Sequence, residues 1–431
     1  MAQLPEELLQ HICSYLRIEC SPKSQAEDRL RLATLAKFSL ASKACERSAE
    51  THLYFALDLR NNPFARLRPF LVTLARRPSL RALVQRIHND FFETQRDVDS
   101  GNAETEAPSA DIGTQMTSLA NAISDDDLRD HITTSLAKGV QDAELALLLC
   151  SCPNLRLWET VAVNRMDQTL CMAVIRAAAP GDQATHTPPL QHLSEIRVSH
   201  WDTEGAVRMP KIQSLLELPA LKTFRGRMIC CDETNPVTSK HSSILERLYL
   251  DESVIDEAGL TSLLPTLPRL ETLSVHWASS IVGTCDLSFI ALGGVLRSHG
   301  KGLRNLTLKT SDANVHRNAS IPLGDLRPLE QLRMLSVPET LLFSDLKSPL
   351  DDHWLAQRLP TSLRTLRLIA ADDDTAEALD KQISTLISDS AFAELTTIKI
   401  NRSEEFTMDV SDIGWDESES TKFWVTLKTI A

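Results

Sequence analysis

The sequence predicts an α/β protein in which three short N-terminal helices precede an irregular solenoid of strand-helix units. Two observations predict this fold. A short phrase, apolar-x-x-apolar-x-apolar, returns through the last two-thirds of the chain, and apolar residues at helical spacing lie between most copies. Each unit leaves one apolar face uncovered, so neighbouring units must stack to form a continuous core. A chain of 431 residues accommodates one solenoid and a small extra domain.

Residues 1–60 contain three stretches whose apolar residues recur at helical spacing. The stretches are Leu4, Leu8, Ile12 and Leu16; Leu32, Leu35 and Phe38; and Ala41, Cys45, Ala49 and Leu53. Pro5 lies where a first helical turn tolerates proline. We therefore expect three helices, and we expect a partner or the solenoid to stabilise them because so small a domain is marginal alone.

Residues 61–148 are predicted to form a basic helical connector and an acidic, partly disordered insertion. Seven arginines and no acid lie from Arg60 to Arg86. The apolar residues at helical spacing among them favour a solvated helix face over a nucleic-acid site. Residues 98–115 are rich in polar and small residues and are the expected disordered insertion.

Residues 149–402 carry the repeated phrase. Full copies begin at Leu193, Leu245, Leu270, Leu303, Leu332, Leu363 and Leu395, and weaker copies begin at Leu155 and Leu221. The last two apolar positions of a phrase are two residues apart, which is the period of a strand. Residues 260–267 and 376–386 have the spacing of amphipathic helices instead. Residues 403–431 are predicted to be an acidic C-terminal tail.

The spacing of the phrase resembles that of the leucine-rich-repeat family. If the phrase fills the core, the intervening strand residues face the concave side of the predicted horseshoe. The candidate substrate-binding residues there are Arg197, Arg225, Arg227, Arg247, Tyr249, His276, Lys309, Arg367 and Lys399. Most are basic in a chain of net charge −13, which suggests a groove for an acidic or phosphorylated segment. Ordinary solvated strand positions would give the same pattern, and both interpretations stand.

The N-terminal stretch resembles the F-box. LPEELLQHICSYL resembles its opening helix, FSLASKAC its middle segment and AETHLYFALDL its closing stretch. An F-box followed by leucine-rich repeats resembles fungal-type F-box proteins. The resemblance implies a substrate-recognition subunit of an SCF-type ubiquitin ligase, with a Skp-type adaptor and, through it, a cullin scaffold as partners.

By the same resemblance, the adaptor-facing residues would be Leu4, Pro5, Leu8, Ile12, Leu16, Leu35, Leu40, Ser42 and Lys43. These apolar residues would otherwise hold the three helices together. The competing function is a non-catalytic leucine-rich-repeat binding scaffold that is not coupled to ubiquitination, with the helices serving as a cap on the solenoid. Such a cap would bury its apolar residues against the first repeat.

Enzymatic, cofactor and metal-binding roles are not expected. The sequence contains no nucleophile elbow, no glycine-rich phosphate loop and no His-x-x-x-His pair, and its nine cysteines are irregularly spaced. It also has no signal-peptide character and no apolar run of 18 residues. We therefore expect an intracellular protein of the cytoplasm, the nucleus or both, whose partners include neither a membrane nor nucleic acid.

Overall fold

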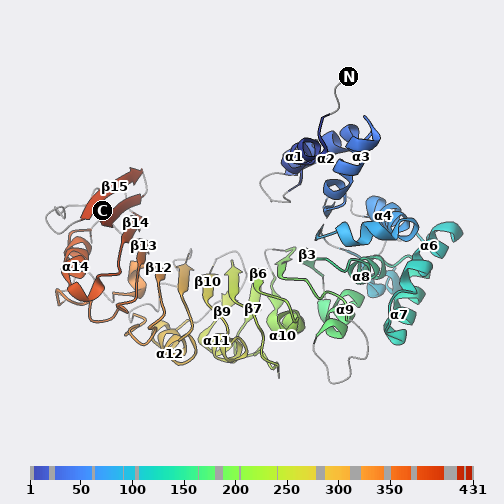
Figure 1. Cartoon of the computed structure of the whole chain (residues 1–431). Coiled ribbons are helices and arrows are strands. Elements are labelled where there is room, and N and C mark those ends of the chain that lie inside the picture. The colour runs from blue at the N-terminus through green and yellow to red at the C-terminus, as the bar shows by residue number, and fades with distance from the viewer. Residues whose placement is uncertain are drawn as a thin grey trace. The chain divides into compact units, whose positions relative to one another are not determined.

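The computed structural model describes residues 4–18, 25–60, 64–90, 92–101, 106–163, 165–179, 188–202, 205–239, 241–277, 287–310, 322–343, 351–369, 376–401, 415–421 and 424–429. The chain divides into two compact units (Figure 1). The N-terminal unit comprises residues 1–201 and 214–221, and the C-terminal unit comprises residues 202–213 and 222–431. Each unit is described by itself.

Three helices open the N-terminal unit, as predicted. They are α1 (Glu6–Tyr15), α2 (Gln25–Ser39) and α3 (Lys43–Leu53). Their small core consists of Cys13, Leu35 and Ala49, with Leu16, Phe38 and Leu53 packed against it. The hydroxyl of Ser42 accepts a hydrogen bond from the backbone N–H of Cys45 at 3.1 Å, which caps the start of α3.

Four parallel strands follow in the order β1-β2-β3-β4. They are β1 (Ala56–Leu59), β2 (Arg86–Asn89), β3 (Leu157–Ala162) and β4 (Glu195–His200). The parallel strands therefore begin before residue 149, since β1 lies within residues 1–60 and β2 within residues 61–148. In β2 the third apolar position of the phrase is taken by Asn89, which is buried.

Helices fill the rest of the N-terminal unit. They are α4 (Phe64–Arg76), α5 (Gln95–Asp99), α6 (Ala110–Ala120), α7 (Asp126–Ala137), α8 (Gln141–Ser151) and α9 (Leu170–Ala178). Helix α6 begins at Ala110, within residues 98–115, where disorder was expected. Residues 102–105 lie outside the described residues. Asp125 is the N-cap of α7, accepting from the backbone N–H of Leu128 at 2.9 Å.

The C-terminal unit contains seven parallel strands followed by an antiparallel pair, in the order β6-β8-β10-β11-β12-β13-β14-β16-β15. The parallel strands are β6 (Thr223–Arg227), β8 (Arg247–Asp251), β10 (Thr272–Trp277), β11 (Asn305–Thr310), β12 (Met334–Pro338), β13 (Thr365–Ile369) and β14 (Thr397–Asn401). The pair is β15 (Trp415–Thr421) and β16 (Trp424–Thr429). These two strands lie within the predicted C-terminal tail, and residues 402–414 lie outside the described residues.

Helices of the C-terminal unit connect its strands. They are α10 (Met209–Ile212), α11 (Glu257–Leu263), α12 (Phe289–His299) and α14 (Ala376–Ser388), and three short strands, β5 (Val207–Arg208), β7 (Ile229–Cys231) and β9 (Val254–Ile255), form a separate sheet. Short 3-10 helices of the whole chain span Pro78–Leu83, Met166–Gln168, Gln213–Glu217, Leu264–Thr266, Glu339–Leu341 and Ser390–Phe392. Figure 1 shows α11 and α12 on one face of the parallel strands.

The register of the strands matches the repeated phrase. Leu248, Leu273 and Leu306 are partners on β8, β10 and β11 and are wholly buried. Their neighbours on each strand, such as Tyr249 and Ser274, point to the opposite face. The molecule is thus an α/β protein with N-terminal helices and largely parallel strands that alternate with helices, consistent with a leucine-rich-like repeat. Within the described residues, no helix is both long and apolar enough to cross a bilayer.

Two adjacent glycines of α12, Gly293 and Gly294, differ in how much space surrounds their Cα atoms. A Cβ on Gly293 would lie 1.8 Å from the carbonyl oxygen of Leu323, whereas the nearest contact for one on Gly294 is an Arg297 nitrogen 3.8 Å away. We expect Gly293→Ala to lower the free energy of unfolding by about 1–3 kcal/mol and Gly294→Ala to raise it by up to about 1 kcal/mol. Urea denaturation of both variants checks this, and equal stability of the two would contradict the close approach.

Candidate functional site

One face of α1 presents apolar side chains to solvent. Leu8, Ile12 and Tyr15 share this face because they are four and three residues apart, and they are 48%, 40% and 70% exposed. Leu4, just before the helix, is 55% exposed. The opposite face of α1 packs into the small helical core through Cys13. The helix is therefore apolar on two faces, of which only one is covered.

Two more exposed apolar side chains lie nearby in the sequence. Leu30 of α2 is 68% exposed, and Leu40, between α2 and α3, is 86% exposed. Eight large apolar side chains are exposed among the described residues, and six of them lie between residues 4 and 40. Single exposed apolar residues are normal, but such a concentration in one small bundle indicates a surface that another molecule covers. We call Leu4, Leu8, Ile12, Tyr15, Leu30 and Leu40 the exposed N-terminal set.

The predicted adaptor-facing residues divide into two groups. Most are exposed: Leu4, Pro5, Leu8, Ile12, Leu40, Ser42 and Lys43. Leu16 is half-buried and packs against the helical core, and Leu35 is fully buried in it. Leu35 is thus corrected to a core residue, because no partner reaches a side chain that three helices enclose. Tyr15 and Leu30 are also exposed but were not among the predicted residues, although the spacing of Tyr15 from Ile12 places it on the same face of α1.

The second candidate region is the strand face opposite the buried phrase. Each candidate residue is adjacent to at least one buried position on β4, β6, β8, β10, β11, β13 or β14, and buried positions alternate with more exposed ones along these strands. In the C-terminal unit, Arg225 is the register partner of Tyr249, and His276 is the partner of Lys309. The candidates therefore form rows across neighbouring strands.

Several basic residues of β6, β8 and β10 are engaged within the protein. Arg227 pairs with Glu252 at 2.6 Å, and Nδ1 of His276 lies 2.7 Å from Asp251. The guanidinium of Arg225 stacks over the Tyr249 ring, 3.9 Å from its centroid. Arg247 donates to the Thr223 hydroxyl at 2.9 Å and lies 3.6 Å from a Glu246 oxygen. These contacts occupy much of the hydrogen-bonding capacity that an anionic ligand would need.

The basic residues of β11, β13 and β14 lack the ion pairs described for β6, β8 and β10, within the described part of the chain. Lys309 and Arg367 are exposed and Lys399 is partly exposed, and no described carboxylate forms an ion pair with any of them. Arg367 and Lys399 are direct register partners. Like charges in such positions repel, so a ligand with negative charge would relieve this repulsion. This part of the strand face is the better candidate for binding an acidic segment.

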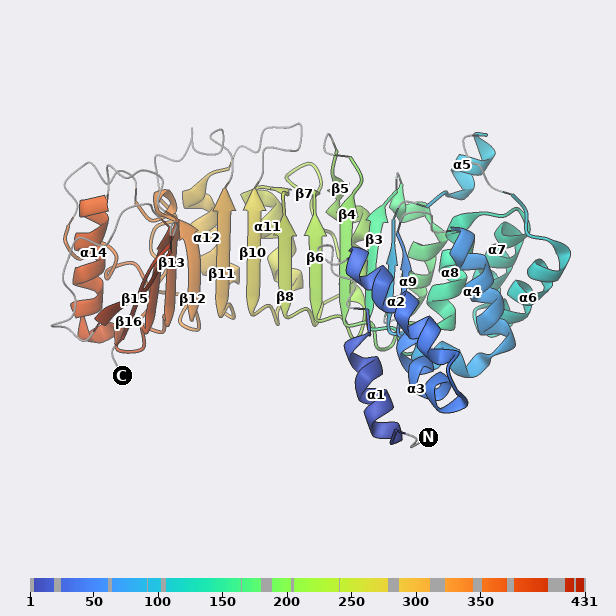
Figure 2. The same ribbon diagram turned by 90° about the horizontal axis from the view of Figure 1, so that it is seen from above.

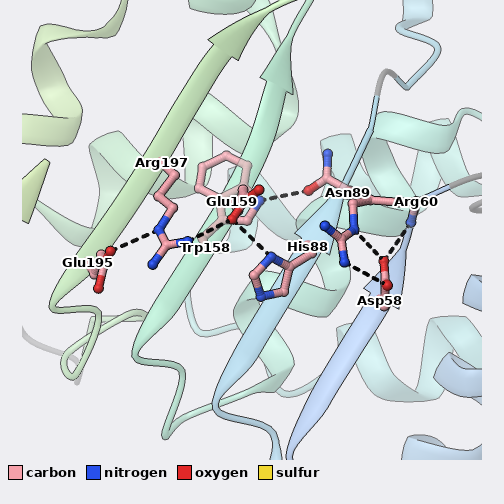
Figure 3. Close-up of polar contacts among 8 residues, drawn as sticks. All are labelled: Asp58, Arg60, His88, Asn89, Trp158, Glu159, Glu195 and Arg197. Carbon is pink, nitrogen blue, oxygen red and sulfur yellow. Dashed lines mark hydrogen bonds and ion pairs between the residues drawn. The ribbon is translucent and has the colours of Figure 1, made fainter. Parts of the chain in front are cut away.

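A row of alternating charges crosses the strands of the N-terminal unit (Figure 3). Asp58, His88, Glu159 and Arg197 are register partners on β1 to β4. Arg197 donates to Glu159 at 3.3 Å and to Glu195 at 2.8 Å, and Figure 3 shows it pointing toward both. Arg197, predicted to bind substrate, is thus held by two carboxylates of its own unit.

This row shifts the pKa values of its carboxyl groups. Burial favours a higher pKa for Glu159, but the His88 contact at 3.1 Å and the charges of His88 and Arg197 outweigh it and lower the pKa. Burial also acts upward on Asp58, and Arg60, which donates to both of its oxygens at 2.9 Å, lowers the pKa. Both carboxyl groups therefore remain charged at neutral pH, and each has a basic partner.

Burial makes several of the described thiols poor nucleophiles. Burial raises the pKa of Cys150 and Cys231 to about 12 and the pKa of Cys152 further, so these thiols are protonated at neutral pH. Across the described ranges, no group of three or more His, Cys, Asp or Glu residues is arranged to hold a metal ion.

Comparison with models of known protein families gives no match, and comparison with curated proteins gives no significant match either.

Proposed function

We propose that this chain is the substrate-recognition subunit of an SCF-type ubiquitin ligase. In this proposal the exposed N-terminal set docks on a Skp-type adaptor, which connects to a cullin scaffold, and the strand face holds the target protein. The chain makes and breaks no bond itself. It would accelerate ubiquitin transfer by raising the effective concentration of target lysines near the charged conjugating enzyme.

The exposure of the N-terminal set is the observation that carries the proposal. A bundle that served only as a cap would bury its apolar residues, whereas Leu8, Ile12 and Leu40 are 48%, 40% and 86% exposed. Covering an exposed leucine or isoleucine contributes about 1.5–3 kcal/mol when burial is complete. A few such residues at the centre of an interface are enough to dominate its affinity. This supports docking of the F-box-like segment over the scaffold alternative.

The target is proposed to carry an acidic or phosphorylated segment. Lys309, Arg367 and Lys399 support this, because they are basic, accessible and without a described carboxylate partner. The strand face on β6 to β10 supports it less, since Arg227 and His276 are already paired with acids. A neutral or basic target segment would not gain from this arrangement of charges.

The test is a pull-down of the purified chain with a recombinant Skp-type adaptor. We expect the wild type to bind and the double variant Leu8→Asp, Ile12→Asp to lose binding, because two charges would then be buried in the interface. The matched control is Ile290→Asp on α12, which places the same charge at a residue that is 49% exposed but outside the bundle. This control should bind as the wild type does.

Folding of all variants is checked by circular dichroism. No binding by the wild type would refute the ligase proposal and leave the binding scaffold as the interpretation. Equal loss in the double variant and in Ile290→Asp would show that the N-terminal set is not the specific contact.

A further inference from the structure

Three consecutive strands of the C-terminal unit are each preceded by an arginine. Arg304, Arg333 and Arg364 lie directly before β11, β12 and β13, which Figure 2 shows side by side. The backbone N–H of Arg333 donates to the Arg304 carbonyl, and that of Arg364 to the Arg333 carbonyl, both at 2.8 Å. Neighbouring strands are about 4.8 Å apart, so the three side chains originate along a line of about 10 Å.

These arginines line a surface hollow of about 410 Å³. Glu330 and Glu394 are also in its lining, so three positive charges and two negative charges face the hollow. It lies at the amino ends of the strands, which separates it from the strand-face residues Lys309 and Arg367 near the middle and the carboxyl ends. None of the residues predicted from the sequence to bind substrate belongs to this hollow.

The three guanidinium groups are engaged to different extents. Arg364 contacts Glu394 at 2.9 Å and Arg304 contacts Glu271 at 3.6 Å. In both pairs each side chain is 45% exposed or more, and such pairs contribute little and are readily exchanged for another anion. For Arg333, no ion pair or hydrogen bond through its side chain occurs within the described part of the chain. The central cation of the row therefore has its donors available.

We propose that this hollow binds a phosphorylated side chain of an extended peptide, with Arg333 as the central contact and Arg304 and Arg364 beside it. A phosphoryl group carries nearly two negative charges and three acceptor oxygens, and guanidinium groups bind such oxygens in a fork geometry. Glu330 and Glu394 repel any anion, so the preference for a phosphoryl group over a carboxylate comes from its larger charge and its third acceptor oxygen. This inference rests on the target-binding role proposed above and adds to the strand face a separate site for a phosphorylated side chain, and binding at the hollow does not require the adaptor.

The experiment measures binding of a fluorescein-labelled glycine-serine pentapeptide with one central phosphoserine to the full chain, by fluorescence anisotropy without adaptor. Arg333→Gln is expected to weaken binding at least about tenfold, the effect of losing a hydrogen bond to a charged group. Arg333→Lys, which keeps the charge and loses the fork, should fall between that variant and the wild type. Glu330→Gln is expected to tighten binding about two- to fivefold, because it removes a like charge beside the phosphoryl group.

The matched control is Arg327→Gln. Arg327 pairs with Asp325 at 2.8 Å on the same part of the chain but does not line the hollow, so its loss should leave binding unchanged. Equal weakening by Arg327→Gln and Arg333→Gln would overturn the site in favour of general attraction. Equal binding of a peptide with glutamate or unmodified serine at the centre would overturn the phosphoryl assignment. Because no adaptor is present, each of these outcomes is independent of the adaptor pull-down.

Discussion

Replacing Arg68 by alanine is expected to destabilise the N-terminal unit strongly at pH 8 and much less at pH 5. Nε of Arg68, on α4, donates to Oε1 of Glu144, on α8, at 2.6 Å. The Glu144 side chain is fully buried, and its Oε2 has no hydrogen-bond partner among the described residues. At pH 8 this removal is expected to cost about 2–3 kcal/mol, because the variant loses a hydrogen bond and must either keep an uncompensated buried charge or protonate a carboxyl group whose pKa in the wild type is about 7.

The pH dependence follows from the pKa of Glu144. Burial raises this pKa from 4.5 to about 7, and the hydrogen bond and charge of Arg68 oppose the rise only in part. A raised folded-state pKa means that the native protein binds a proton more tightly than the unfolded chain. The contribution of Glu144 to stability is then full below about pH 4.5 and is lost as the pH rises through 7.

Near pH 5 the carboxyl group is largely protonated in the folded wild type and in the variant alike. The cost of Arg68→Ala should then approach that of one hydrogen bond, about 1 kcal/mol. Urea denaturation at pH 5 and pH 8 measures the difference. The double variant Arg68→Ala, Glu144→Gln is the control and should recover most of the stability at pH 8, because no buried charge remains. An equal cost of Arg68→Ala at both pH values would contradict the assigned titration.

The parallel strands from β3 onward follow the full or weaker copies of the phrase, and the full copies are the clearest. Leu248 with Leu250, and Leu366 with Leu368, alternate with polar residues and are buried as the period requires. The phrase is incomplete in β2, whose third position is Asn89. Its amide donates to the Thr160 hydroxyl of β3 at 2.8 Å.

The side-chain oxygen of Asn89 also has a hydrogen-bond partner. Its side-chain oxygen accepts a hydrogen bond from the indole N–H of Trp158 at 2.8 Å. A polar residue in the core is tolerated when such partners exist, but these partners lie 69 and 71 residues away in the sequence. A local pattern therefore cannot find β2, and the same reason hid the start of the repeats.

For the candidate sites, too, the sequence predicts some features and tertiary contacts determine the others. Helical spacing identified Leu8 and Ile12 on one face of α1, but which face of a two-sided helix is covered depends on α2 and α3. Leu35 of α2 is buried because its side chain lies in the core that the three helices share. The period of the strand likewise predicts the face on which Arg227 lies. Its pairing with Glu252 depends on the turn after β8, the next strand, because Glu252 is 25 residues later in the sequence. Periodicity predicts the side from which a residue projects, and the tertiary contacts decide whether it is available to a ligand.

Trp277→Ala is expected to lower the free energy of unfolding by about 3–5 kcal/mol, because it leaves a large cavity in the C-terminal unit. Trp277 ends β10 and is 1% exposed, and its indole N–H donates to the Ile255 carbonyl at 2.7 Å. Trp277→Phe keeps most of the buried ring and loses this hydrogen bond, so its cost should be nearer 1 kcal/mol.

Trp201 provides the matched control for this variant. Both tryptophans lie at the carboxyl end of a parallel strand, Trp277 as the last residue of β10 and Trp201 directly after β4. Unlike Trp277, Trp201 is 56% exposed, so Trp201→Ala should change stability by no more than about 0.5 kcal/mol. Urea denaturation followed by circular dichroism measures all three variants without relying on tryptophan fluorescence. Equal costs for Trp277→Ala and Trp201→Ala would mean that Trp277 does not anchor β10 between β8 and β11, and the strand face built on β10 would then lose its fixed support.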